Sequence, residues 1–154
     1  MGFLSFERYI AGLGAGAPAA EGPWGEEQNS DYESGLVRLG GELWRIRTAR
    51  VTPTKPGAFL AVWERGPDGQ TRPFAEGGGV AGLLVLVDEP TLSGETLRGV
   101  FRFSERMLVE QGIVRSAAKP GKRGFRVYPS WCVGLNTQAQ RTQRAQAAAF
   151  TRLA

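Results

Sequence analysis

Apolar residues near the start of the chain recur every three to four positions, the spacing of one helix face. The residues on this face are Phe3, Phe6, Tyr9, Ile10 and Leu13. Glu7 and Arg8 interrupt the run, so the segment lacks the basic start and unbroken apolar core of a signal peptide. We therefore expect a short amphipathic helix that packs on the domain. A linker rich in Gly, Ala and Pro should follow, so residues 1–25 form an N-terminal helix and linker.

The middle of the chain alternates apolar and polar residues, which predicts strands joined by turns. Thr52–Gly57 must interrupt this pattern, because its two prolines cannot donate to a strand ladder. The expected elements are a strand at 36–39, a turn at Gly40-Gly41, a strand at 43–51, a strand at 58–65, a turn at 66–69 and a returning strand at 70–74.

The second half of the chain predicts further strands and two helices. Residues 83–87 form a continuous apolar run, which is typical of a strand buried on both faces. Strands at 97–103 and 124–128 and helices at 104–112 and 138–153 complete the expected elements. Ser104 should cap the first helix, and Asn136 or Thr137 the second. We therefore expect one α+β domain with a mainly antiparallel central sheet flanked by helices.

Charge is distributed unevenly along the 154 residues, whose net charge is +4. The first 34 residues hold one cation, Arg8, against six acids. The segment from Gln111 to the end holds eight cations and no acid. This asymmetry favours an anionic partner for the C-terminal third. A solvated basic face without a partner would produce the same pattern.

Residue types that are absent or rare limit the possible chemistry. The chain has no histidine and a single cysteine, Cys132, which excludes Ser–His–Asp catalysis, Cys–His catalysis and His-ligated metal sites. A carboxylate site for a hard cation remains open. One cysteine cannot form an intrachain disulfide, which fits a cytoplasmic location. No apolar stretch reaches the length of a membrane span, and we expect no cofactor.

Six segments together resemble the MepB family. They are QNSDYE (28–33), RTARVTPTKPGAF with a later Trp (47–63), Pro73-Phe74, FRFS (101–104), GKRGFRVYPSW (121–131) and QAQRTQ (138–143). The resemblance identifies residues 26–154 as a MepB-like domain. Founding members of the family are encoded beside multidrug-efflux genes in bacteria. The resemblance implies nucleic-acid binding and a fold likened to restriction-type nucleases.

Nine residues in three clusters are the candidate contacts with nucleic acid. They are Arg50, Thr52, Lys55, Lys122, Arg123, Arg126, Tyr128, Gln138 and Arg141. Strand alternation places Phe125 and Val127 in the core and presents Arg126 and Tyr128 to a partner. Arginine and lysine bind phosphate, and an aromatic ring can stack a base. Each cluster also fits a structural turn or a solvated face.

Three further residues of the same clusters admit other roles. Arg47 is expected to be partly buried and to pair with a carboxylate. Trp131 fits either the core or a stacking surface. Arg144 fits an ordinary solvated helix face.

Three other functions remain open. Restriction-type sites use Asp/Glu-x-Lys, and the chain has no such motif; a displaced metal site would have to use Glu33, Glu64 and Lys55. Another is a small-molecule sensor that binds nucleotides or cationic drugs, and for such drugs it could draw on the acidic N-terminal third and Trp24. A protein-interaction module would dock an acidic partner through the basic C-terminal third.

Overall fold

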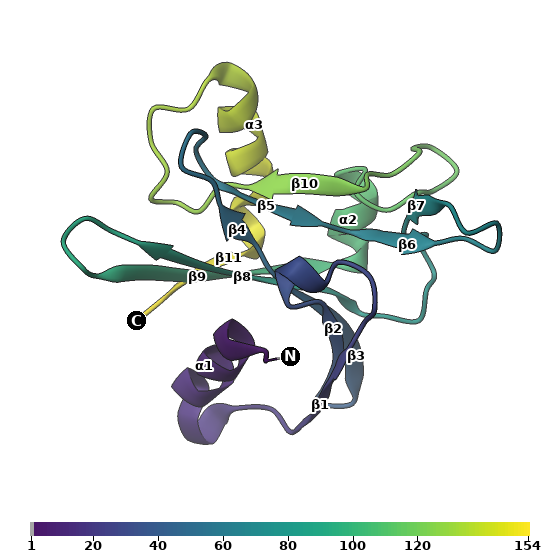
Figure 1. Ribbon diagram of the computed structural model, residues 1–154, viewed down its shortest axis with the longest axis horizontal. Coiled ribbons are helices and arrows are strands. Elements are labelled where there is room, and N and C mark those ends of the chain that lie inside the picture. The colour runs from purple at the N-terminus through teal and green to yellow at the C-terminus, as the bar shows by residue number, and fades with distance from the viewer. Residues whose placement is uncertain (1) are drawn as a thin grey trace.

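A sheet of six strands runs through the middle of the molecule (Figure 1). The computed structural model describes residues 2–154. The strand order is β1-β2-β3-β8-β9-β11, and neighbours are antiparallel except for the parallel pair β3 and β8. The strands are β1 (Ala20–Gly25), β2 (Gly35–Leu39), β3 (Glu42–Thr48), β8 (Gly82–Pro90), β9 (Thr96–Ser104) and β11 (Phe150–Leu153). The predicted α+β domain with a mainly antiparallel sheet is confirmed.

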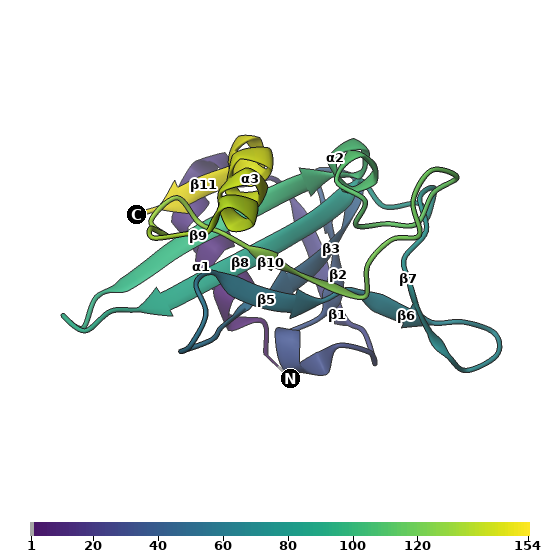
Figure 2. The same cartoon turned by 90° about the horizontal axis from the view of Figure 1, so that it is seen from above.

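A smaller sheet lies across one face of the large sheet (Figures 1 and 2). It has the order β10-β5-β4, and a short hairpin of β6 and β7 extends from it. These strands are β4 (Arg50–Val51), β5 (Ala58–Ala61), β6 (Trp63–Arg65), β7 (Thr71–Pro73) and β10 (Gly124–Val127). The chain leaves the large sheet at Ala49, whose N–H still donates to the Leu86 carbonyl at 2.9 Å. The predicted strand over residues 43–51 is therefore divided between two sheets.

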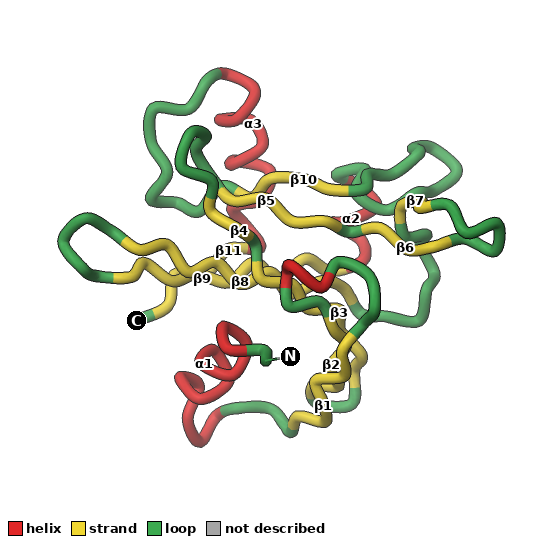
Figure 3. Tube along the Cα trace, in the orientation of Figure 1, coloured by secondary structure: helices red, strands yellow, loops and turns green. Residues whose placement is uncertain are grey.

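Three helices and three short 3-10 turns join the strands (Figure 3). They are α1 (Leu4–Leu13), η1 (Gly14–Gly16), η2 (Ser30–Tyr32), α2 (Glu105–Glu110), α3 (Thr137–Gln146) and η3 (Ala147–Ala149). Both predicted caps form, because Ser104 Oγ accepts from the Met107 N–H at 3.2 Å and Asn136 Oδ1 accepts from the Ala139 N–H at 2.8 Å. Within residues 2–154, no helix has the length and apolar character needed to cross a bilayer.

Strand β8 is buried on both faces, as its apolar run predicts. Leu83, Val85 and Val87 belong to the cluster between the two sheets, together with Leu60, Phe101, Phe103, Phe125 and Val127. Leu84 and Leu86 point the other way, into a cluster with Phe3, Phe6, Val37, Trp44, Ile46 and Val100. The molecule thus has three layers, with the small sheet and α3 on one face of the large sheet and α1 on the other (Figure 1). The predicted packing of α1 on the domain is confirmed.

The predicted hairpins also form. Gly40 and Gly41 have φ values of 54° and 87°, the left-handed conformation that a two-residue hairpin turn requires. They join β2 to β3. The returning strand predicted near 70–74 is β7, which pairs with β6. The predicted strand over residues 58–65 is divided at Val62, whose N–H donates to the Arg123 carbonyl.

Two sequence predictions are wrong at the ends of the chain. Residues 20–25, expected as linker, form β1 on the edge of β2. The helix expected over 138–153 ends at Gln146, and Phe150–Leu153 form β11 on the edge of β9. Helix propensity is a weak preference that tertiary contacts override. Here the Phe150 ring packs 4.8 Å from Phe101, centroid to centroid, and β11 pairs with the open edge of β9.

Candidate nucleic-acid interface

A groove follows the open edge of β10, where that strand faces α3. Its volume is about 560 Å³, and we call it the β10–α3 groove. Five of the nine predicted contact residues line it: Lys122, Arg126, Tyr128, Gln138 and Arg141. Its charged lining residues are Lys122, Arg126, Arg141 and the acid Glu110. The Glu110 carboxylate already accepts from Arg106 Nε at 2.8 Å, so the groove is predominantly basic.

Strand β10 sorts its side chains as the alternation predicts. Phe125 and Val127 are buried in the core, with 7% and 0% of their surface exposed. Arg126 points outward, and its Nη1 donates to the Pro56 carbonyl at 3.3 Å. This bond connects the β10–α3 groove to the turn between β4 and β5.

The other predicted residues lie outside the β10–α3 groove. Arg50 is exposed on β4, opposite Phe59 of β5. Thr52 and Lys55 belong to the turn after β4, where Thr52 Oγ1 donates to the Lys55 carbonyl at 3.4 Å. Arg123 faces the other side of β10, and its Nη2 donates to the Thr71 carbonyl at 3.2 Å. The structure therefore does not unite all nine residues in one site.

Gln146, at the end of α3, holds the open edge of β10. Its Nε2 donates to the Arg126 carbonyl at 2.8 Å, and its Oε1 accepts from the Tyr128 N–H at 2.9 Å. The side-chain amide thus takes the place of a neighbouring strand along two residues. Gln146 is 1% exposed. Sequence reasoning missed it, because a glutamine in a polar helix gives no sign of burial.

Gln143, also on α3, binds the chain that leaves β10. Its Nε2 donates to the carbonyls of Pro129 and Cys132 at 3.0 and 3.2 Å. Part of the polar face of α3 therefore binds backbone groups of the neighbouring segment. This contact and that of Gln146 fix α3 as the second wall of the β10–α3 groove.

A second groove lies on the outer face of the small sheet, and we call it the aromatic groove. Its volume is about 920 Å³. Three aromatic residues line it, Tyr32, Phe59 and Trp63, and each comes from a different element. Residues 27–31 form part of its lining, so the QNSDYE segment borders it. Sequence reasoning missed this groove, because its rings are far apart in the chain.

Arg126 lies next to both grooves. In the strand register it stands opposite Phe59, which in turn stands opposite Arg50. The Arg126 guanidinium carbon is 5.9 Å from the centroid of the Phe59 ring. Tyr32 meets the same ring edge-on, with centroids 6.2 Å apart. The outer face of the small sheet thus carries an aromatic ring between two arginines.

Packing beside the grooves explains why two positions in the segments that resemble the MepB family are glycine. A Cβ at Gly124 would lie 2.5 Å from Phe59 Cζ, so the Phe59 ring covers this position. Gly57 has a φ of 79°, and a Cβ there would lie 2.6 Å from the Val127 carbonyl oxygen. A side chain at Gly124 would displace the Phe59 ring, and one at Gly57 would displace the β10 backbone at Val127.

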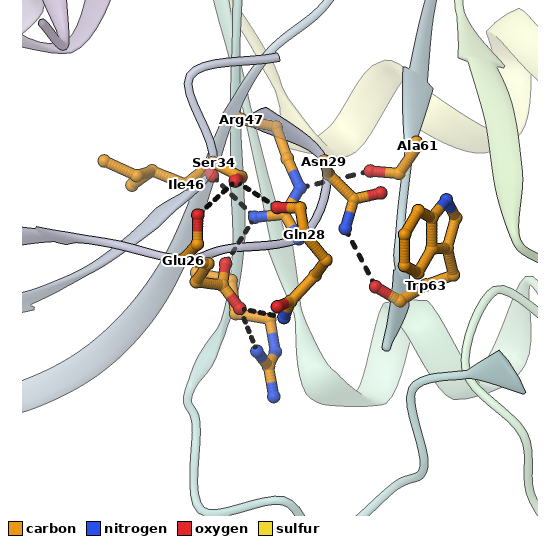
Figure 4. Close-up of polar contacts among 9 residues, drawn as sticks. Glu26, Gln28, Asn29, Ser34, Ile46, Arg47, Ala61 and Trp63 are labelled. Carbon is orange, nitrogen blue, oxygen red and sulfur yellow. Dashed lines mark hydrogen bonds and ion pairs between the residues drawn. The ribbon is translucent and has the colours of Figure 1, made fainter. Parts of the chain in front are cut away.

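A buried ionic network supports the loop beside the aromatic groove (Figure 4). Glu26 accepts from Arg47 Nη1 at 2.7 Å and from Arg45 Nη1 at 3.0 Å. Arg47 also donates through Nε to the Ala61 carbonyl at 3.1 Å. The predicted pairing of Arg47 with a carboxylate is confirmed, although Arg47 is fully buried and not partly so. Burial lowers the pKa of both guanidinium groups, and the nearby Glu26 carboxylate opposes this shift.

The same network fixes residues 28–34. Gln28 Nε2 donates to the Glu26 carboxylate at 2.9 Å, and Ser34 Oγ donates to the Gln28 carbonyl. Asn29 Nδ2 donates to the Trp63 carbonyl at 2.8 Å (Figure 4). The loop is therefore attached to both β3 and β6. A rigid loop is a suitable wall for a binding groove.

The carboxylates considered for a displaced metal site have separate partners. Glu33 accepts from Thr48 Oγ1 at 2.6 Å, and Glu64 accepts from Arg72 Nε at 3.0 Å. In the described part of the chain, no three His, Cys, Asp or Glu residues are grouped as metal ligands would be.

The two tryptophans with alternative interpretations lie outside both grooves. Trp131 packs edge-on against Phe150, with ring centroids 5.7 Å apart, and its Nε1 donates to Glu89 at 3.1 Å. Trp131 therefore packs at the edge of the hydrophobic core. Trp24 is 48% exposed on β1.

Comparison with known proteins agrees with this architecture. The MepB-like family model matches residues 26–152. The chain belongs to the MepB-like family. It is similar to the crystal structure of MepB, with 29% identity, a TM-score of 0.81 and 95% of each chain covered. That coverage extends beyond residues 26–152, so the MepB likeness includes part of the N-terminal segment. No curated protein matches the chain.

Proposed function

We propose that this MepB-like protein binds nucleic acid through the β10–α3 groove, without chemical change to the ligand and without a cofactor. One observation carries the proposal: Lys122, Arg126 and Arg141 line a single groove whose acid, Glu110, is already paired. Three cations that form no ion pair with a carboxylate along one groove match the spaced charges of a phosphate backbone. Tyr128 and Gln138 add a ring and an amide to the same lining.

Binding of this kind is mainly electrostatic and tolerant of sequence, because phosphate contacts carry no sequence information. Three phosphate contacts give a slope of log affinity against log salt of about −2 for single strands and about −3 for duplexes. A cytoplasmic location is part of the proposal and is supported by the single cysteine.

Oligonucleotide titration at several salt concentrations tests the proposal. The test variant replaces Lys122, Arg126 and Arg141 with alanine. The control variant replaces Arg8, Arg38 and Arg102, which lie outside both grooves, and changes the net charge by the same amount. Fluorescence anisotropy of a labelled strand reports affinity. The test variant is expected to lose most of the affinity and nearly all of the salt slope, at about 0.7 of a unit for each residue on a single strand and about 0.9 on a duplex.

The control variant is expected to keep the wild-type salt slope, with a small loss from the changed net charge. Equal losses in the two variants would show that net charge, and not the groove, causes binding. Affinity that does not respond to salt would also contradict the proposal.

A further inference from the structure

The aromatic groove differs from the β10–α3 groove in charge. Its charged lining residues are two arginines, Arg65 and Arg123, and two acids, Glu27 and Asp31, so the formal charges cancel. A phosphate chain would meet both acids there. An uncharged planar group whose edge can form hydrogen bonds fits this lining better. Aromatic rings form part of the lining, and polar groups form the rest.

Contacts with neighbouring residues hold the rings of the aromatic groove in place. Phe59 lies over Gly124 and meets Tyr32 edge-on. Trp63 has the Arg65 guanidinium carbon 5.4 Å from its ring centroid, and its backbone carbonyl is held by Asn29. Fixed rings stack a base with little loss of side-chain entropy.

The two grooves adjoin across β10. Arg126 lines the β10–α3 groove, and its guanidinium also lies near the Phe59 ring. Lys122 and Arg123 are neighbours in sequence and line opposite grooves. A ligand that crosses β10 therefore meets cations on one side and aromatic rings with balanced charge on the other.

From this juxtaposition we propose that the ligand is a single-stranded nucleic acid, with phosphates in the β10–α3 groove and unpaired bases against Trp63 and Phe59 in the aromatic groove. This inference rests on the proposed function. Bases of a duplex are stacked inside the helix and cannot reach these rings, whereas unpaired bases can turn outward and stack.

Three probes of equal length separate the parts of the proposal: a single strand, the same strand without its bases, and a duplex. The abasic strand keeps the phosphates and removes the stacking groups. One stacked base is worth about a 5- to 150-fold gain in affinity. Wild-type protein is therefore expected to bind the base-bearing strand at least about fivefold more tightly than the abasic strand.

Variants at Trp63 assign this gain to the aromatic groove. Trp63→Ala is expected to lose the preference for the base-bearing strand and to bind the abasic strand with unchanged affinity, which also shows that the variant is folded. Trp63→Phe is expected to restore part of the preference. Trp24→Ala, at an exposed tryptophan outside both grooves, is the matched control and is expected to behave as wild type.

Equal affinity for the base-bearing and abasic strands would overturn the inference and leave the proposed function standing. Tighter binding of the duplex, or an equal loss on both strands in Trp63→Ala, would overturn it too. If none of the three probes binds, the proposed function itself fails.

Discussion

At the scale of single residues, Glu26 is unusual because one carboxylate pairs with two arginines. Its carboxylate is 8% exposed and faces two guanidinium groups, of which Arg47 is fully buried. The sequence predicts a carboxylate partner for Arg47 because a buried arginine needs one. It does not identify Glu26, which lies 21 positions away and meets Arg47 only after β3 and the loop before β2 have come together.

Replacing Glu26 should therefore cost more stability than replacing either arginine. Glu26→Ala leaves both guanidinium groups without their carboxylate and should lower the free energy of unfolding by about 3–5 kcal/mol. Arg47→Met leaves the pair of Glu26 with Arg45 intact, so its loss should be smaller. Urea unfolding followed by tryptophan fluorescence measures both losses. A larger loss in Arg47→Met would contradict the central role given to Glu26.

At the scale of elements, the contact between α3 and β10 depends on polar side chains that bind backbone. The Ala-, Gln- and Arg-rich composition of residues 138–146 predicts the helix correctly. It does not predict that Gln146 completes the edge of β10, since the partner groups belong to a strand 18 to 20 residues earlier. The helix propensity of this segment also gives no sign that the helix ends at Gln146. Phe150–Leu153 form β11, which is stabilised by pairing with β9.

Gln146→Ala should open the edge of β10. It leaves the Tyr128 N–H and the Arg126 carbonyl without partners, at a cost of about 1–3 kcal/mol for each group that stays buried. Hydrogen exchange at the Tyr128 amide should become faster. In Gln146→Glu the carboxylate still accepts from Tyr128 but cannot donate to Arg126, so Tyr128 should remain protected. Fast exchange in both variants would contradict the capping role.

At the scale of the whole molecule, the hydrophobic pattern of the sequence predicts the layers of the fold better than it predicts the sites. The apolar run of β8, the hairpins and the two caps could be predicted from sequence because each depends on neighbouring residues. Sequence reasoning names five residues that line the β10–α3 groove, and whether they bind a ligand stays a prediction. It does not show that these five share one groove, because α3 and β10 meet only in the folded chain. The aromatic groove could not be predicted, because loop 27–32, β5 and β6 meet only in the folded chain.

Removing residues 1–25 should destabilise the protein, because the predicted helix packs on the domain and the predicted linker contains an edge strand. The deletion takes away β1, the buried Phe6 ring of α1 and the buried ring of Phe3, which precedes this helix. The loss of these rings alone should lower the free energy of unfolding by about 3–6 kcal/mol. Thermal unfolding measures the effect. An unchanged melting temperature would show that residues 1–25 contribute nothing to the fold.

The position of α3 and β11 after β10 in the chain has a consequence for synthesis. A chain is synthesised from its N-terminus, and its earlier segments can fold before later ones have been added. The wall formed by Thr137–Gln146 therefore emerges after β10, and the sheet edge formed by Phe150–Leu153 emerges after the other strands of the large sheet. Until Gln146 has emerged, the Tyr128 N–H and the Arg126 carbonyl lack their side-chain partner, and the open edge of β10 can pair with another strand.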